Sequence, residues 1–169
     1  DGERGAPLDR FPFEGGDGLW QHMGIDAPAW GPFGGRGEPF GITGTTFKAF
    51  PAVVHSQGPI GLVLELRQQV AVAGISTVHV ATYGEAIRRT AAETEKWDPK
   101  TRETADHSIP YLVAAALHDG AITPATFAMS RIQDPALRPL MKKLTVVEDP
   151  EYTRRYPGES CTRVEVTTT

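Results

Sequence analysis

Cysteine is almost absent from this sequence of 169 residues, which contains only Cys161. A single thiol excludes an internal disulfide and a cysteine-rich zinc site. Cys161 stands in an alternating apolar and polar pattern, so we expect it to be a small hydrophobic residue buried by a strand. The scarcity of cysteine fits a reducing compartment, and we therefore expect a cytoplasmic protein.

Long apolar runs and basic clusters are also missing. No run approaches the ~18 apolar residues that a membrane-spanning helix needs. Lys and Arg total 17 against 21 Asp and Glu, which gives a net charge of −4. Without a block of basic residues, the sequence predicts no face for nucleic acid. Neither a membrane nor a nucleic acid is therefore an expected partner.

The histidines are not spaced like metal ligands. His22, His79 and His118 lie far apart, and we interpret all three as structural or solvated. Residues 13–20, FEGGDGLW, are rich in glycine, but no strand precedes them and no Gly-Lys-Ser/Thr follows. This segment therefore does not predict a phosphate-binding loop. We expect no metal ion and no organic cofactor.

Residues 1–40 differ in composition from the rest of the chain. Glycine and proline recur there, and aromatic residues are scattered among them. Such a segment cannot build its own core, yet it has too many aromatics for a free linker. We expect an extended arm over residues 1–40, laid over another surface, and one domain over residues 41–169. Because the first residue is Asp rather than Met, we expect a fragment of a longer protein.

The remainder alternates between strand and helix patterns. The last two strands are separated by about a dozen residues, too few for a helical crossover, so we expect them to be antiparallel. The order of elements predicts a two-layer α+β domain, with a mostly antiparallel sheet and helices on one face. The expected strands cover residues 42–50, 75–83, 144–147 and 161–168, and the expected helices begin near residues 58, 85, 109, 123 and 134.

Residues 96–111, KWDPKTRETADHSIPY, are the most informative segment. From Ile109 onward, apolar residues recur at the spacing of one helix face. Ser108 stands at the N-cap position, and Gly120 follows the last turn. His107 is thus held at the positive end of a helix, where a carboxylate would be stabilised. The simpler interpretation is that Ser108 only caps and His107 only packs.

Residues 48–57, KAFPAVVHSQ, are the second informative segment. A strand is expected to end near Phe50 and a helix to open at Pro59, so Lys48 and His55 would flank one helix N-terminus. An ammonium group, a titratable imidazole and free backbone donors together suit a di- or tricarboxylate. A surface lysine and a capping histidine are the alternative.

Both segments resemble sequences of the MmgE/PrpD family, and the likeness runs from about residue 13 to residue 169. Members of this family look like two-domain proteins, in which a smaller α+β lid domain is inserted into a large helical domain. This chain resembles the lid and the arm that leads into it. The helical domain, which in the family supplies acidic and further histidine residues to the site, has no counterpart in this sequence.

The resemblance implies a hydro-lyase of the 2-methylcitrate dehydratase kind, which eliminates water from a 2-hydroxy tricarboxylate in propionate catabolism. By matching motif, Lys48 and His55 are the implied catalytic residues, and Ser56, Gln57 and His107 are weaker candidates for binding the substrate. The implied partners are a small di- or tricarboxylate and the helical domain of the same parent protein, and a homodimer is left open. Alone, the chain is expected to be inactive and to expose an apolar surface.

Two alternatives stay open. The parent could be another enzyme of the family, such as a cis-aconitate decarboxylase or an epimerase of amino-dicarboxylates. The chain could also be a stand-alone, non-catalytic binding or assembly module. The His-Ser-Gln that follows Phe-Pro-Ala favours the dehydratase.

Overall fold

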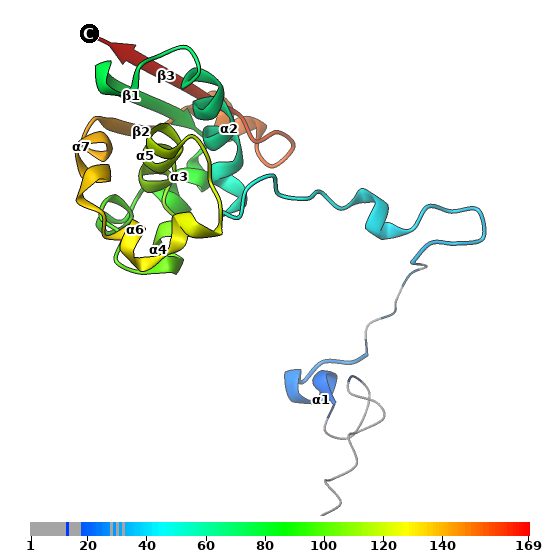
Figure 1. Ribbon diagram of the computed structural model, residues 1–169. Helices are drawn as coiled ribbons and strands as arrows, with labels where there is room; N and C mark the ends of the chain where they lie inside the picture. The colour runs from blue at the N-terminus through cyan, green and yellow to red at the C-terminus, as the bar shows by residue number, and fades with distance from the viewer. Residues whose placement is uncertain (1–12, 14–17, 28, 30, 32) are drawn as a thin grey trace, which may run out of the picture. The chain divides into compact units, whose positions relative to one another are not determined.

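The computed structural model describes residue 13, residues 18–27, residues 29 and 31, and residues 33–169. The chain divides into two compact units, Asp1–Thr46 and Phe47–Thr169. The boundary thus falls a few residues beyond residue 40, where the sequence places the end of the arm. Each unit is described by itself below (Figure 1).

The first unit contains little regular structure in its described part. Helix α1 covers Leu19–Met23 and buries none of its residues, and the 3-10 helix η1 covers Gly41–Gly44. Gly24 ends α1 in the left-handed region, with φ of 65°. The rings of Phe13 and Trp20 stack with their centroids 5.6 Å apart.

The strand predicted over residues 42–50 is wrong. Residues 41–44 form η1, and residues 45–50 have no helix or strand. A strand is stable only beside a hydrogen-bonded partner. All three strands of the described residues belong to one sheet that does not include this segment. Its apolar side chains are accordingly exposed, by 74% at Ile42 and 87% at Phe47.

The second unit is built on a three-stranded mixed sheet. Strand β1 (Ile75–Thr82) lies in the centre, parallel to β2 (Leu144–Glu148) and antiparallel to β3 (Thr162–Thr168). The predicted α+β class is confirmed. The last two strands do run in opposite directions, but they do not pair, because β1 lies between them.

Two longer helices cover the apolar face of the sheet. Helix α2 (Gln57–Leu66) lies against β3, and helix α5 (Ile109–Asp119) lies against β2 and packs on α2 (Figure 1). Val78 and Val80 of β1 point into the core between these layers and are fully buried. The other face is more polar, since His79 Nδ1 lies 2.8 Å from the Thr145 hydroxyl there.

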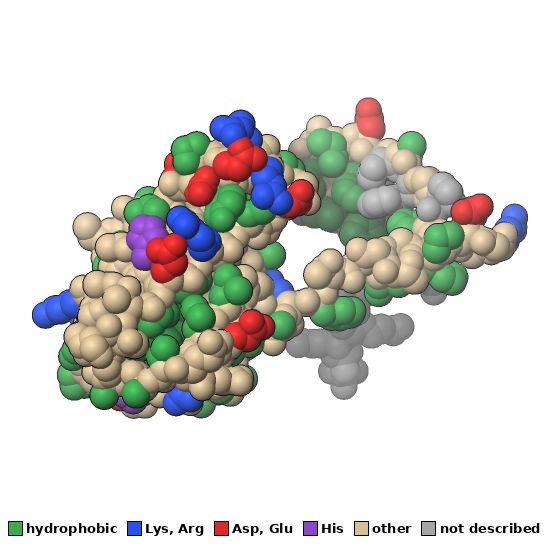
Figure 2. All heavy atoms as spheres, turned by 90° about the horizontal axis from the view of Figure 1, so that it is seen from above, with side chains coloured by type: hydrophobic (Ala, Val, Ile, Leu, Met, Phe, Trp, Pro, Cys, Tyr) green, Lys and Arg blue, Asp and Glu red, His purple; other side chains and the backbone are tan. Residues whose placement is uncertain are grey.

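Within the described part of the chain, no helix is both long and apolar enough to cross a membrane. On the face shown in Figure 2, acidic and basic side chains are interspersed. Short elements complete the second unit. They are η2 (Val54–Ser56), η3 (Val72–Gly74), α3 (Gly84–Thr90), η4 (Thr94–Trp97), α4 (Arg102–Asp106), η5 (Pro124–Phe127), α6 (Met129–Ile132), η6 (Pro135–Leu137), α7 (Arg138–Met141) and α8 (Pro150–Arg155).

Helix α5 begins and ends where the sequence predicts. The Ser108 hydroxyl accepts a hydrogen bond from the Tyr111 N–H at 3.0 Å, and Gly120 ends the helix in the left-handed region with φ of 75°. The same hydroxyl donates to the carbonyl of Lys96. Ser108 therefore connects the start of α5 to the segment that precedes α4.

Candidate active site

The turn that follows Lys48 is held by the first turn of α2. The Gln57 side chain accepts a hydrogen bond from the Phe50 N–H at 3.0 Å through its Oε1 atom. Its Nε2 atom donates to the carbonyls of Phe50 and Ala52, both at 3.1 Å. One amide side chain thus satisfies several backbone groups of a turn that has no regular structure.

Two further contacts fix the same turn on either side. The buried Ser56 hydroxyl donates to the Val53 carbonyl at 2.8 Å. The Val53 N–H donates to the Asp106 carbonyl at 3.2 Å, which ties the turn to the last residue of α4. The turn is therefore anchored between α2 and α4, and it brings Lys48 close to the segment that carries His107.

Lys48 and His107 line one cavity of about 540 Å³, which we call the lysine cavity. Its floor and walls come from the turn, from Asp106 at the end of α4, and from Pro124. The buried Oδ1 atom of Asp106 contacts Nδ1 of His107. The cavity therefore places one ammonium group and one imidazole around the same space.

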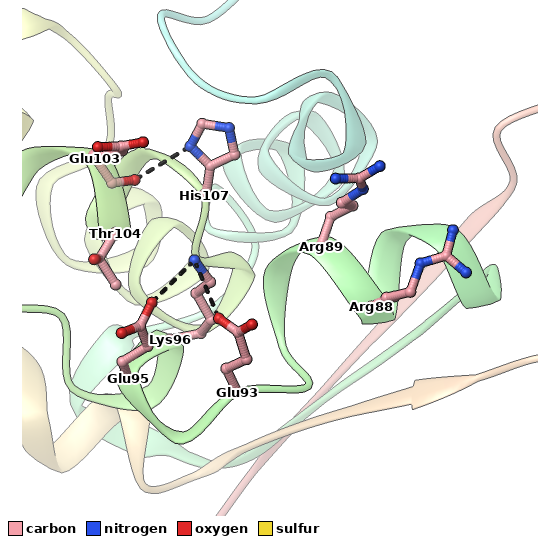
Figure 3. Close-up of a pocket in the computed structure, with 8 residues that line it drawn as sticks. All are labelled: Arg88, Arg89, Glu93, Glu95, Lys96, Glu103, Thr104 and His107. Atoms are coloured by element: carbon pink, nitrogen blue, oxygen red, sulfur yellow. Dashed lines mark hydrogen bonds and ion pairs between the residues drawn. The ribbon is translucent and has the colours of Figure 1, made fainter.

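A second cavity, of about 660 Å³, is also lined by His107, and we call it the arginine cavity. Figure 3 shows His107 at one side of this cavity and two arginines of α3 at the other. Its lining residues are Arg88, Arg89, Glu93, Glu95, Lys96, Glu103, Thr104 and His107. Because His107 lines both cavities, it is the residue that connects them.

The charges in the arginine cavity are unevenly compensated. Lys96 Nζ lies 3.5 Å from a carboxylate oxygen of Glu95 and 3.8 Å from one of Glu93 (Figure 3). By contrast, Arg88 and Arg89 pair with the same carboxylate, that of Glu85. Two guanidinium groups that share one carboxylate leave one net positive charge on the α3 side, while Glu93, Glu95 and Glu103 bring negative charge to the rest of the lining.

His55 lies in η2 and has a defined partner. Its Nδ1 atom is 2.8 Å from the hydroxyl oxygen of Tyr83, the residue between β1 and α3. The two rings meet edge to face with their centroids 5.7 Å apart. Tyr83 in turn stacks on Tyr156, with the centroids 4.5 Å apart and the planes inclined by 12°.

The electrostatic surroundings keep His55 neutral. Burial lowers the pKa of His55 from its usual 6.5, and Coulomb interactions with Arg89 and His107 lower this pKa further. The pKa of Tyr83 is raised, mainly because burial disfavours the phenolate. At neutral pH the pair is therefore an uncharged imidazole bonded to an uncharged phenol, and such an imidazole can accept a proton.

The structure distributes the five predicted site residues over three environments. Lys48 and His107 share the lysine cavity. His55 does not line that cavity, although its pKa is affected by a Coulomb interaction with His107. The side chains of Ser56 and Gln57 are engaged with the backbone of the turn. Their substrate-binding role stays a prediction, and their visible role is to hold the segment that carries Lys48.

Sequence reasoning did not find two residues near the site, Arg89 and Tyr83. Each looked like part of an ordinary element, since Tyr83 ends a strand pattern and Arg89 lies on a short helix. One available signal was position, because the carboxyl end of a buried strand is where side chains are often presented to a site.

Among the described residues, no group of three or more His, Cys, Asp or Glu side chains could hold a metal ion.

Comparison with known proteins identifies the class to which this fold and site belong. The model of the MmgE/PrpD C-terminal domain matches residues 50–169. The chain therefore belongs to the MmgE/PrpD family, and it contains the C-terminal domain of that family. The predicted family resemblance is confirmed.

Three similar curated proteins share the name 2-methylcitrate dehydratase. The 2-methylcitrate dehydratase of Escherichia coli K12 is 31% identical over 149 residues, which cover 78% of this chain and 30% of that protein. The enzyme of Salmonella typhimurium LT2 is 31% identical over 128 residues, which cover 70% of this chain and 26% of that protein. The enzyme of Cupriavidus necator is 30% identical over 113 residues. The chain thus spans less than a third of the length of these relatives.

Proposed function

We propose that this chain is the lid part of a hydro-lyase that acts on a small di- or tricarboxylate, of the 2-methylcitrate dehydratase type. The observation that supports this most is the arrangement around His107. Lys48 and His107 line one cavity, while His55 lies within electrostatic reach of His107 and Arg89. The names of the similar proteins agree with this chemistry.

Elimination of water from a hydroxy acid needs a base and an acid. The C–H bond next to a carboxylate breaks, its proton passes to the base, and its electron pair forms the new carbon–carbon double bond. The neighbouring C–O bond breaks, and the hydroxyl group leaves as water after it receives a proton. In this proposal His55 is the base, because its lowered pKa keeps the imidazole free to accept a proton at neutral pH.

The carboxylates of such a substrate need cationic partners. In this proposal the Lys48 ammonium group binds one carboxylate or the departing oxygen in the lysine cavity. The arginines of α3, which line the neighbouring arginine cavity, attract the remaining negative charge. Positive groups close to the reacting carbon also stabilise the negative charge that develops when the proton leaves.

The rest of the site is proposed to come from the remainder of a longer parent protein. The chain spans only 30% of the length of the Escherichia coli relative. Apolar side chains next to the proposed catalytic residues are also exposed, Phe47 by 87% and Val54 by 56%. We therefore expect the helical part of the parent to cover this surface, and we expect the isolated chain to show no turnover.

The proposal is tested with the full-length parent protein and three substrates. We expect turnover of 2-methylcitrate, measured as the appearance of the unsaturated product in the ultraviolet. Carbon dioxide released from cis-aconitate without turnover of 2-methylcitrate would indicate a decarboxylase instead. Epimerisation of an amino-dicarboxylate would indicate the third kind of enzyme, and no turnover of any of the three would favour a binding module.

The role of His55 is tested by His55→Ala, with His79→Ala as the matched control. Loss of a general base should lower kcat by about two to four decades. His79 is a histidine of the same unit with a similar hydroxyl partner, but it lies on the more polar face of the sheet. Its variant should keep kcat within about twofold, because it is remote from the core face. Near-normal turnover of His55→Ala would remove the assignment.

A further inference from the structure

Tyr83 is placed where it controls the orientation of His55. It lies between the end of β1 and the start of α3, and its side chain is only 2% exposed. Its hydroxyl oxygen is 2.8 Å from His55 Nδ1. A buried residue between a central strand and a helix has little freedom to move, so this hydrogen bond has a fixed geometry.

The aromatic rings around this hydrogen bond restrict it further. Tyr156 stacks on Tyr83 with the ring centroids 4.5 Å apart, and it is 6.3 Å from the ring of His55. The edge of His55 faces the ring of Tyr83 at 5.7 Å. Rotation of the imidazole about its χ2 angle would break both the edge-to-face contact and the hydrogen bond.

A phenol is an unusual choice of partner for a histidine that transfers protons. A carboxylate at the same place would stabilise the imidazolium and raise the pKa of the histidine. A hydroxyl group carries no charge, so it orients the ring and stabilises the imidazolium much less than a carboxylate would. The titratable groups that interact electrostatically with His55 are Arg89 of α3 and His107 beyond α4, and the titratable rings of Tyr83 and Tyr156 lie beside it.

We infer that Tyr83 is a positioning residue for His55. The Tyr83 hydroxyl oxygen accepts the hydrogen of His55 Nδ1, and this leaves His55 Nε2 as the atom that exchanges the proton with the substrate. The inference rests on the proposed function of His55. In the free imidazole, Nδ1–H donates to Tyr83 and Nε2 has the lone pair. After Nε2 has accepted the substrate proton, Nδ1–H still donates to the same oxygen. The hydrogen bond thus serves both states of the catalytic cycle.

The kinetic test compares Tyr83→Phe with Tyr111→Phe in the full-length parent protein. Tyr83→Phe removes the hydroxyl and keeps the stacked ring, and we expect kcat to fall about tenfold with KM nearly unchanged. The acid limb of the kcat profile should move to lower pH, because the buried imidazolium has lost an acceptor for Nδ1–H. Tyr111 is also a buried tyrosine, whose hydroxyl donates to the Thr126 carbonyl at 2.5 Å. Its variant should lose similar stability and keep the pH profile.

A spectroscopic test does not depend on turnover or on the folding of a variant. Nitrogen-15 NMR of the wild-type parent, with labelled histidine, distinguishes a protonated Nδ1 from a protonated Nε2 in the neutral ring. We expect His55 to show a protonated Nδ1, and Tyr83→Phe to shift the population toward a protonated Nε2. A bare Nδ1 in the wild-type protein, or a kcat and pH profile of Tyr83→Phe equal to those of Tyr111→Phe, would overturn the inference. A wild-type parent that turns over none of the carboxylates would overturn the proposed function, and the NMR result would still decide the tautomer.

Discussion

Ser108→Ala should destabilise this chain far more than the loss of an ordinary helix cap. Ser108 is fully buried, its hydroxyl accepts from the Tyr111 N–H at 3.0 Å, and it donates to the Lys96 carbonyl. Alanine removes both hydrogen bonds and adds no other partner. The backbone N–H of the buried Tyr111 and the carbonyl of the partly buried Lys96 then lose those partners.

The expected cost follows from these two losses. An N-cap serine contributes about 1 kcal/mol. Leaving a buried backbone group unpaired costs about 1–3 kcal/mol. The value for the N-cap already includes the loss at the Tyr111 N–H, so only the cost at the Lys96 carbonyl is added to it. We therefore expect the free energy of unfolding to fall by about 2–4 kcal/mol in total. This is a large fraction of the roughly 5–15 kcal/mol that stabilises a typical domain.

Thr101→Ala is the matched control for this prediction. Thr101 caps α4 in the same way, with its hydroxyl accepting from the Thr104 N–H at 3.1 Å, but its side chain is exposed. Water can replace the lost hydrogen bond there, so we expect a cost of about 1 kcal/mol. Urea denaturation of both variants at one pH, with unchanged m-values, measures the difference. Equal costs for Ser108→Ala and Thr101→Ala would refute the reasoning from burial.

Three further predictions concern other parts of the second unit. Gly120→Ala should lower the free energy of unfolding by about 1–2 kcal/mol, because φ of Gly120 is +75° and the new Cβ would lie 3.0 Å from the Arg67 guanidinium. Gly74→Ala is the control and should cost less, since the space around Gly74 is open. Urea denaturation measures both values. The pKa of His55 in the folded chain is below its usual 6.5, so the unfolded chain binds a proton at this residue more readily. The stability that this group contributes is therefore present above pH 6.5, and it is lost as the pH falls toward the folded pKa. His55→Gln should therefore reduce the loss of stability between pH 7.5 and pH 5, and an unchanged pH dependence would contradict this. In the parent protein, Lys48→Met should raise KM for the carboxylate substrate by about tenfold or more, because a charge-assisted hydrogen bond is lost. An unaltered KM would exclude Lys48 from substrate binding.

Local patterns in the sequence predicted the elements that are stabilised locally. Helix α5 begins after Ser108 and ends before Gly120, as the apolar spacing and the two caps indicate. A helix is predicted to begin near residue 134, and the structure has the short helices η6 and α7 there. These predictions succeed because caps, turns and helix periodicity depend on residues within a few positions of one another.

The errors concern elements that depend on distant parts of the chain. The sequence predicts a strand over residues 42–50, but no strand of the described residues pairs with them. In the sheet, the pairing of β1 with both β2 and β3 gives one parallel and one antiparallel pair. No local pattern specifies which strand lies in the centre, because that depends on how the helices cover the sheet.

The candidate site shows the same division. The sequence marked Lys48, His55 and His107 by the motifs in which they stand, and it identified the family from them. It did not indicate that His107 would line two cavities. It also did not indicate that His55 would bond to Tyr83, which lies 28 residues further along the chain.

The sequence by itself determined the family, the α+β class, and the start and end of the best-capped helix, since each of these is written in short-range patterns and motifs. Only the tertiary structure decided which side chains face one another. Burial of Tyr83 beside His55, and the shared wall of Lys48 and His107, arise when segments far apart in the chain pack against one core. Contacts of that kind depend on the summed packing of the whole unit, and no single segment encodes them.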